Sequence, residues 1–461
     1  MSFADLRAFL RALEAARQLA CVRVEVDPRF EVAAICRKAL ADGGPGLLFE
    51  NVKGSRHAFA ANLLASRERM AIALGVDPDA LLTYWRDQGA RLIDPVIVED
   101  GPSQEEVLLG DDLDFGRFGL PTWNARDGGP YITFPCYISQ NPATGGFDCG
   151  MYRTQVFDGR TLGFNAGPHR HLSMNRERSG DPDGRFPVAI ALGLDPVVQI
   201  ATVAGLPYGV SELSLAGALR GEPVELVRCK TVPLVAPATA EIVLEGYITQ
   251  SIREEGPFGE FHGYYGEAGQ RPVIELTAIT CRRDAIHQEA YEGRPPHEDA
   301  VMQGIASACE IFRQVQLAGI KAVHITPHSG GHLHCVVSVK KPVDSYAKMV
   351  GMGVLGCWAG RNVKVVTVVD DDVDVYDPGE VEWAVATRVD YGHDVEIIRG
   401  TTGIPLDPSV PPGDRERQNA RVSKMIVDAT RTNARSFPQE ATPPADVVER
   451  VLRQWSTYGI S

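Results

Sequence analysis

The spacing of apolar residues changes character twice along this 461-residue chain, and that change constrains the fold more than any single motif. Between about residue 130 and residue 290, short β-prone runs such as "VAIALGL" and "VIELTAITCR" are separated by turns that contain Gly or Pro. This pattern is typical of a β-barrel or a β-sandwich. On either side, helical spacing alternates with strand-like runs, which predicts α/β domains.

The pattern therefore predicts a mixed α+β and α/β protein with several domains. We expect an N-terminal α/β domain over 1–115, a β-rich domain over 116–300, a C-terminal α/β domain over 301–430, and a linker with a terminal helix over 431–461. The Gly- and Pro-rich segment "FGLPTWNARDGGPYI" marks the first boundary. Where the third domain begins, Val301, Ile305 and Phe312 lie on one helical face.

Composition argues against several classes of function. The formal charge of −14 disfavours binding to nucleic acids, because a phosphate backbone needs a basic face. We expect no membrane-spanning helix, since no run of about 18 apolar residues occurs. Leu6, Leu10 and Leu13 have the spacing of an amphipathic helix rather than of a signal peptide. The nine cysteines include no C-x-x-C pair, which favours reduced thiols and a cytoplasmic protein.

The stretch "EEGPFGEFHGYYG" places Glu255 and Glu260 on either side of a Gly-Pro-Phe-Gly turn. Because Pro257 fixes one backbone angle and the glycines permit a tight bend, we expect the two carboxylates to lie near each other. A carboxyl group beside another one in a dry site has a raised pKa and can carry a proton near neutral pH. The alternative is a pair of solvated loop glutamates.

The motif "FDCGMYRTQ" contributes a cation. Arg153 lies on a β-prone run, so its side chain can point to one fixed face. From there its guanidinium could bind a substrate carboxylate or the two glutamates through paired hydrogen bonds. The alternative is an ordinary salt bridge on the surface of a strand. We interpret Cys149, in the same motif, as a buried residue without a chemical role.

A third group of residues could hold a metal ion. Asp148, Glu212 in "YGVSELS" and one histidine of "GPHRHLSM", either His169 or His171, would form a ligand set made mostly of oxygen. Such a set suits a hard divalent ion such as Mg²⁺ or Mn²⁺, with phosphate oxygens completing the shell. Two half-exposed loop histidines without a ligand are the alternative.

Two further patterns are less specific. Lys364 begins an apolar strand that ends in Asp370, Asp371 and Asp372, an acidic cluster that could bind a metal or cap a loop. The segment "GMGVLG" fits G-x-G-x-x-G but follows a helical run, which favours helix packing over a dinucleotide site. No P-loop and no G-x-S-x-G elbow occurs, so nucleotide hydrolysis and serine hydrolysis lack their usual signatures.

Taken together, these elements resemble the UbiD family of decarboxylases, which use prenylated FMN. The segments that carry the resemblance stand in family order from about residue 100 to 430 and are "GMYRTQVFDGR", "GVSELSLAGALRGEPVELV", "VLEG", "EEGPFGEFHGYYG", "YEGRPPHEDAVM", "VDDDVDV", "WAVATR" and "MIVDAT". The resemblance implies that the β-rich domain is a flavin-reductase-like split β-barrel that binds the cofactor. It also implies a C-terminal α/β domain that mediates homodimer or homohexamer formation.

The resemblance also implies roles for single residues. The catalytic Glu–Arg–Glu network of the family corresponds to Glu255, Arg153 and Glu260, with Glu260 in the place of the proton donor. A Mn²⁺ or Mg²⁺ ion that bridges to the cofactor phosphate would be held by Asp148, His171 and Glu212, and K⁺ is a further expected ion. The other expected cofactor contacts are Met151, Tyr152, Arg170 and, at the phosphate end, Lys364.

The activity implied by the family is the reversible, non-oxidative decarboxylation of an unsaturated, aromatic or heteroaromatic carboxylic acid. Prenylated FMN would accept electron density as carbon dioxide leaves, and Glu260 would protonate the remaining carbon. The cofactor would depend on a separate flavin prenyltransferase. Two other interpretations are a non-catalytic subunit of a larger (de)carboxylase assembly and an ordinary flavin oxidoreductase.

This sequence departs from the family pattern at Asp148, where the family usually has asparagine. The aspartate can still bind a divalent ion, but it adds a negative charge beside a phosphate. The metal-binding histidine has two candidates, because the spacing from Arg153 favours His171 whereas an "HR" pair points to His169. His297, in "RPPHEDA", could face the substrate or begin a helix.

Overall fold

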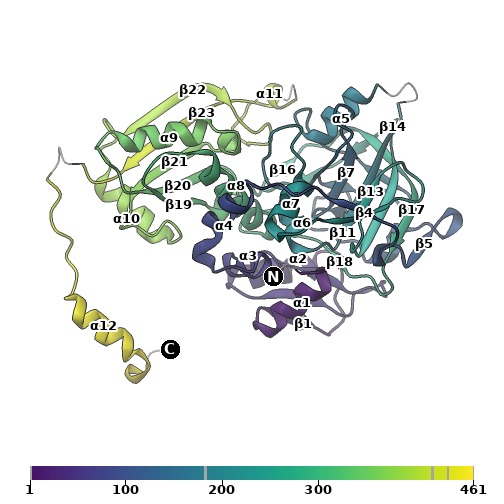
Figure 1. The fold of residues 1–461 in the computed structure, drawn as a ribbon, viewed down its shortest axis with the longest axis horizontal. Helices are drawn as coiled ribbons and strands as arrows, with labels where there is room; N and C mark the ends of the chain where they lie inside the picture. The colour runs from purple at the N-terminus through teal and green to yellow at the C-terminus, as the bar shows by residue number, and fades with distance from the viewer. Residues whose placement is uncertain (1–2, 181–183, 417–419, 433–435, 460–461) are drawn as a thin grey trace.

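The computed structural model describes residues 3–180, 184–416, 420–432 and 436–459. Figure 1 shows the C-terminal part in green beside the β-rich central part in teal, with the N-terminal part in purple below them. Helices and strands are mixed throughout, so the predicted α/β organisation with several domains is confirmed.

The N-terminal part forms a small four-stranded sheet whose strand order is β1-β2-β3-β18. Its strands are β1 (Leu19–Val22), β2 (Gly46–Phe49), β3 (Phe59–Ala61) and β18 (His287–Gln288). Its helices are α1 (Leu6–Ala15), α2 (Glu31–Ala41), α3 (Arg67–Leu74) and α4 (Leu81–Gln88). The predicted amphipathic helix at the start is α1, which Asp5 caps by accepting the backbone N–H of Ala8 at 2.7 Å. Because β18 comes from far along the chain, this sheet joins the N-terminal part to the central part.

The central part is built on a seven-stranded, antiparallel sheet with the order β10-β17-β14-β11-β7-β8, in which β5 also pairs with β17. Its strands are β5 (Glu106–Leu108), β7 (Cys136–Gln140), β8 (Phe147–Gly150), β10 (Thr161–Gly163), β11 (Phe186–Leu192), β14 (Ile242–Glu255) and β17 (Gly269–Cys281). In the part of the chain that the structure describes, no pairing joins the edge strands β8 and β10, so this sheet does not close into a barrel. The narrower expectation of a split barrel stays a prediction.

Smaller sheets and helices complete the central part as far as the structure describes it. The strands are β4 (Val96–Val98), β12 (Glu225–Arg228) and β13 (Val235–Pro237) in one sheet, β6 (Tyr131–Ile132) and β9 (Thr154–Gln155) in the second, and β15 (Phe258–Gly259) and β16 (Tyr265–Gly266) in the third. The helices are α5 (His171–Ser179), α6 (Pro196–Ala201) and α7 (Glu212–Arg220). Since β4 and β5 pair with central strands, residues from 96 onward contribute to the central sheets, ahead of the predicted boundary at 115.

The C-terminal part is a five-stranded sheet with the order β19-β20-β21-β23-β22. Its strands are β19 (Ile320–Ile325), β20 (His334–Val339), β21 (Val365–Asp370), β22 (Val395–Thr402) and β23 (Arg421–Ala429). The three middle strands are parallel and both edge strands are antiparallel. The accompanying helices are α8 (Glu298–Gln314), α9 (Tyr346–Gly356), α10 (Pro378–Arg388) and α11 (Pro412–Glu416). "GMGVLG" lies inside α9, as helix packing requires.

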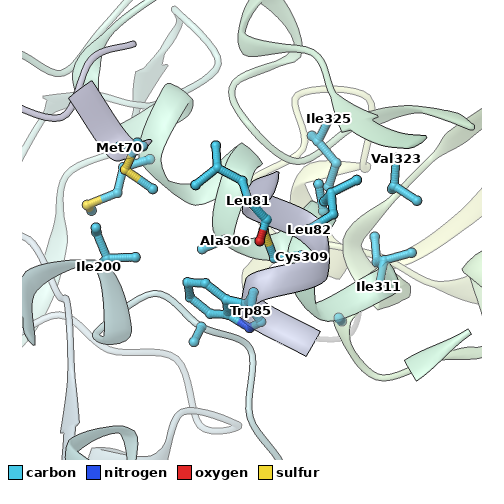
Figure 2. Close-up of a cluster of buried hydrophobic side chains, with 14 of the residues drawn as sticks. Met70, Leu81, Leu82, Trp85, Ile200, Ala306, Cys309, Ile311, Val323 and Ile325 are labelled. Atoms are coloured by element: carbon cyan, nitrogen blue, oxygen red, sulfur yellow. The ribbon is translucent and has the colours of Figure 1, made fainter. Parts of the chain in front are cut away.

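Helix α8 connects the parts through a shared hydrophobic core. Figure 2 shows Leu81, Leu82 and Trp85 of α4 beside Ala306, Cys309 and Ile311 of α8, with Val323 and Ile325 of β19 nearby. The indole N–H of Trp85 donates to Glu310 at 2.8 Å, so the only polar atom of this buried ring is satisfied. This packing places the start of α8 against the central part, where the cavity described below lies.

Short 3₁₀ helices connect several of these elements: η1 (Pro78–Ala80), η2 (Pro102–Gln104), η3 (Gly110–Asp112), η4 (Phe115–Phe118), η5 (Pro327–Ser329), η6 (Ala359–Asn362) and η7 (Trp455–Tyr458). The predicted terminal helix is α12 (Ala445–Arg453), which Figure 1 shows at the end of an extended segment, away from the rest of the chain. Val448 and Leu452 of α12 and Trp455 of η7 are exposed. Among the described helices, none combines the length and the apolar character that crossing a bilayer demands.

Candidate active site

A cavity of about 1160 Å³ has walls from the central part and from the C-terminal part. This is somewhat larger than the roughly 300–1,000 Å³ of a usual ligand pocket, so it has room for a cofactor together with a small substrate. Of the predicted Glu–Arg–Glu network, Arg153 and Glu260 line the cavity and Glu255 does not. The other predicted site residues that line it are Met151, Tyr152, His169, Arg170, His171 and Glu212.

The backbone around the "GPFG" turn positions the two predicted glutamates. Glu255 is the last residue of β14, and Glu260 directly follows β15 in a two-stranded hairpin with β16. Gly256 between them has a φ of 100°, a conformation that side chains disfavour. Arg153 lies between β8 and β9, so three segments converge at one point.

The structure brings these three side chains into one network. The Nε and Nη2 atoms of Arg153 donate to the two carboxylate oxygens of Glu255, each at 3.3 Å. The Nη1 atom of Arg153 donates to Oε1 of Glu260. The guanidinium also lies over the ring of Phe258, 5.1 Å from its centroid. One cation is therefore shared by two buried carboxylates.

The two carboxyl groups have opposite pKa shifts, because their surroundings differ. Burial opposes ionisation of Glu255, but the charge of Arg153 and hydrogen bonds from Arg153, Asn165 and Tyr131 hold its pKa below the usual value. The Asn165 amide donates at 2.9 Å and the Tyr131 hydroxyl at 3.0 Å. Glu260 has fewer donors, so burial raises its pKa, despite Arg153, and the negative charge of Glu255 adds to the increase. The surroundings of Glu255 therefore favour its anionic form, and those of Glu260 favour a bound proton.

The second predicted set also comes together. Ligand atoms of Asp148, His171 and Glu212 lie within 4.8 Å of one another, and Nδ1 of His171 is 3.1 Å from Oε1 of Glu212. Of the two candidate histidines, the structure therefore assigns His171 to this cluster, whereas His169 lines the cavity without joining it. Two carboxylates and one imidazole match the preferences of a hard or borderline divalent ion.

Neighbouring groups orient these three side chains. Asn175 donates from its amide to Asp148 at 2.9 Å, and the backbone N–H of Cys149 donates to Glu212 at 3.1 Å. Burial raises the pKa of Glu212, although its hydrogen bond with His171 opposes the shift. Cys149 is buried, as predicted.

Lys364 lies elsewhere. Its ammonium group donates to Asp407 at 2.8 Å and to Ser409 at 2.6 Å, and it does not line the cavity. The segment that includes Leu406 and Pro408 does line the cavity, so Lys364 supports one wall of it. The predicted contact between Lys364 and a cofactor phosphate stays a prediction that this ion pair does not support.

Other predicted alternatives are also resolved by the geometry. His297 begins α8: its Nδ1 accepts the backbone N–H of Ala300 at 3.2 Å. The acidic cluster after β21 forms ion pairs rather than an open metal site, since Arg388 contacts Asp370 and Asp372 at 3.1 Å each.

Sequence reasoning missed several residues of the site. Tyr131 and Asn165 reach Glu255 from segments far away in the chain, and no motif marks them. Arg361 and His332 line the cavity near Arg170, and burial together with the charge of Arg170 lowers the pKa of Arg361 to about 10. A pair of arginines on one wall could bind a phosphate. The only available signal was "WAGRNVK", whose arginine precedes the apolar strand β21.

Models of three domains of 3-octaprenyl-4-hydroxybenzoate carboxy-lyase (UbiD) match this chain in order. The N-terminal domain matches residues 10–88, the Rift-related domain residues 96–295 and the C-terminal domain residues 300–429. Together they cover most of the chain.

Solved structures of such enzymes have the same fold. The UbiD-class enzyme HmfF from Pelotomaculum thermopropionicum, in complex with FMN, is 35% identical, with a TM-score of 0.87 over 96% of this chain and 98% of that chain. Vanillic acid decarboxylase from Sedimentibacter hydroxybenzoicus is 29% identical, with a TM-score of 0.86 over 99% of this chain and 100% of that one. The 3,4-dihydroxybenzoic acid decarboxylase from Enterobacter cloacae is 27% identical, with a TM-score of 0.85 over 98% and 100%. This chain therefore belongs to the UbiD family of carboxy-lyases.

Proposed function

We propose that this protein catalyses the reversible, non-oxidative decarboxylation of an unsaturated, aromatic or heteroaromatic carboxylic acid, with prenylated FMN as cofactor and Glu260 as proton donor. The observation that carries this proposal is the shared guanidinium of Arg153, which contacts two buried carboxylates whose pKa values shift in opposite directions. Such a pair separates the roles of a permanent anion and a proton carrier.

The residues of the cavity fit the expected cofactor and metal. Asp148, His171 and Glu212 provide two anionic ligands and one imidazole for Mn²⁺ or Mg²⁺, and they lie beside the cavity that also holds Arg153. Arg170 and Arg361 supply positive charge for a phosphate. When bound there, prenylated FMN would accept the electron density released as the carboxylate leaves. K⁺ has no assigned ligands in this structure and stays an expectation.

The protein's own part in the reaction follows from the network. Glu255, held as an anion by Arg153, Asn165 and Tyr131, keeps the guanidinium in place. The guanidinium orients the carboxyl group of Glu260 through its hydrogen bond. Because burial keeps the pKa of Glu260 above its usual value, this group can deliver a proton to the carbon that has lost carbon dioxide. In the reverse direction it would take the proton back.

Assembly and cofactor supply belong to the same proposal. We expect a homodimer or homohexamer. Exposed apolar residues at the C-terminal end, Val448 and Leu452 of α12 and Trp455 of η7, are available to pack on another copy. A separate flavin prenyltransferase would supply the cofactor, and the central part would form the flavin-reductase-like split barrel. A non-catalytic subunit would have no use for a shared Arg153 and two buried carboxylates inside a cavity.

The direct test is Glu260→Gln in protein co-expressed with a flavin prenyltransferase. Decarboxylation of a panel of aromatic and acrylic acids, followed by CO₂ release, should collapse together with incorporation of solvent deuterium into the product. The flavin absorbance should persist, since Gln can still accept the hydrogen bond from Arg153. Turnover that survives in this variant would remove Glu260 from the role of proton donor.

A further inference from the structure

A second pair of acidic side chains lies on the wall of the same cavity, outside the Glu–Arg–Glu network and outside the metal cluster. Glu292 is 6% exposed and Asp299 is 3% exposed, and both line the cavity, as does Gln303. Glu292 precedes the start of α8 and Asp299 lies in its first turn. Buried carboxyl groups of this kind are normally paired with a cation or fully hydrogen-bonded.

Asp299 and His297 both form hydrogen bonds within the protein. The side-chain amide of Gln303 donates to both oxygens of Asp299, each at 2.6 Å. Nδ1 of His297 accepts the backbone N–H of Ala300, and its Nε2 donates to the carbonyl of Phe261 at 3.0 Å. Both nitrogens of the imidazole are therefore occupied, and its Nε2 lies 3.6 Å from Oε2 of Glu292, beyond hydrogen-bond distance.

Glu292 is left with an unsatisfied atom. Its Oε2 is buried and has no hydrogen-bond partner among the described residues. Leaving a buried acceptor unpaired is unfavourable, so a ligand group that donates a hydrogen bond would gain by meeting it. Burial, the charge of Asp299 and a side-chain hydrogen bond with Asp299 raise the pKa of Glu292, so these two crowded carboxyl groups share a proton. Oε2 of Glu292 remains an acceptor without a donor among the described residues.

We propose that Glu292 is the recognition site for a hydrogen-bond donor on the substrate. This inference rests on the proposed decarboxylation and narrows its substrate class to carboxylic acids that carry an O–H or ring N–H, such as phenolic or pyrrole-type acids. A second carboxylate would meet the negative charge that the Glu292–Asp299 pair keeps after sharing one proton, and would be repelled. The proton that Glu292 holds is shared with Asp299, so an ether oxygen or a ring oxygen would meet only the acceptor Oε2.

A metal ion explains the same residues less well. Ligand atoms of Glu292, His297 and Asp299 do lie within 4.8 Å of one another. However, a metal on His297 would take one of its two nitrogens from the cap of α8 or from Phe261. A substrate donor at Oε2 of Glu292 leaves both of these hydrogen bonds intact.

The test compares pairs of acids that differ mainly in one donor: pyrrole-2-carboxylate with furan-2-carboxylate, and 4-hydroxybenzoate with 4-methylbenzoate. Binding to the purified flavin-loaded protein is measured by calorimetry, and kcat/KM is measured beside it. In the natural protein, the donor-bearing member of at least one pair should bind roughly tenfold to a hundredfold more tightly. In Glu292→Met, which has no acceptor, that ratio should fall to about one, and in Glu292→Gln, which keeps a neutral acceptor, it should be intermediate.

Glu267→Met is the matched control, because Glu267 also lines the cavity but is exposed to solvent, and its variant should keep the natural ratio. The proposal is overturned if both members of each pair bind the natural protein equally, or if Glu292→Met leaves the ratio unchanged. A binding ratio that depends on Glu292 without any CO₂ release would uphold this site and refute the proposed reaction. If both members of a pair bound equally and both released CO₂, the proposed reaction would be upheld and the recognition site at Glu292 refuted.

Discussion

A β-carbon on Gly266 would lie 2.5 Å from Oε1 of Glu260. Gly266 is in β16 and pairs with Phe258 of β15, so this hairpin holds the glycine against the carboxyl group that Arg153 orients. Its φ is not in the left-handed region, so the requirement for glycine is one of space. The bare Cα of Gly266 is what allows Glu260 to occupy its position.

We therefore predict that Gly266→Ala lowers decarboxylation by about tenfold to a hundredfold, because displacing a catalytic group by about 1 Å can cost that much. The melting temperature should change little, because moving the Glu260 side chain relieves the clash. Steady-state kinetics and thermal melting check both parts. Gly269→Ala is the control, because a β-carbon there would make only an ordinary contact with Arg271, at 3.4 Å. Equal activity in the two variants would contradict the prediction.

The pH dependence of activity should follow Glu260. The proton donor works in its protonated form, so kcat/KM should fall as pH rises through the pKa of Glu260, which burial raises above the usual 4.5. The charge of Asp127 adds to that shift. Asp127→Asn should therefore move the falling limb of the pH–rate profile to lower pH, by up to about one unit. If the falling limb of the pH–rate profile did not move in Asp127→Asn, a group other than Glu260 would be responsible for it.

Removal of one ligand should empty the metal site. In Glu212→Ala, His171 loses its ion-pair partner and Cys149 loses the acceptor of its backbone N–H. We expect protein with less than about one tenth of the natural Mn²⁺ and flavin content, since losing a charged ligand removes most of the affinity of such a site. Metal analysis and flavin absorbance measure this. Glu177→Ala, at the exposed rim of the same cavity, should keep both, and normal occupancy in Glu212→Ala would count against the site.

Loss of the shared cation should be costly for stability. Arg153→Met leaves Glu255 and Glu260 buried without a counter-charge, for which we expect about 3–5 kcal/mol of destabilisation near pH 7. In the natural protein the pKa of Glu255 is depressed, so its contribution is present above about pH 4.5 and is lost as pH falls through the lower, folded-state value. In the variant Glu255 loses that stabilisation and the pKa of Glu260 rises further, because Arg153 no longer opposes the shift. The difference in melting temperature should therefore shrink as the pH is lowered toward about 4.

The control for this variant is Arg253→Met, which removes a half-exposed ion pair with Asp158 at 3.7 Å. An exposed pair of this kind contributes roughly 0–1 kcal/mol, so little change is expected at any pH. If Arg153→Met were as stable as Arg253→Met near pH 7, the two buried carboxylates would have to be neutral in the natural protein as well.

Much of the site could be predicted from sequence because its residues lie in short motifs whose order identifies the family. Arg153, Glu255 and Glu260 were expected together, and the structure brings them together. Tyr131 and Asn165 could not be predicted, because Tyr131 of β6 and Asn165, which follows β10, meet Glu255 of β14 only in the folded chain. The same holds for Lys364, whose partner Asp407 comes from a segment that no local pattern connects to it.

The sequence by itself determined the local elements: α1 and α8 through apolar spacing and N-terminal caps, the β-rich middle through its turn residues, and the bend at Gly256. Each of these local elements depends on interactions between residues close together in the chain, so the amino-acid sequence is enough to predict it. Only the tertiary structure decided that the pKa of Glu260 is raised while that of Glu255 is lowered, and that Oε2 of Glu292 has no hydrogen-bond donor among the described residues. Both properties depend on burial and on distances to groups far along the chain, since a pKa reports the charges and dipoles around an atom and not the residues beside it in sequence.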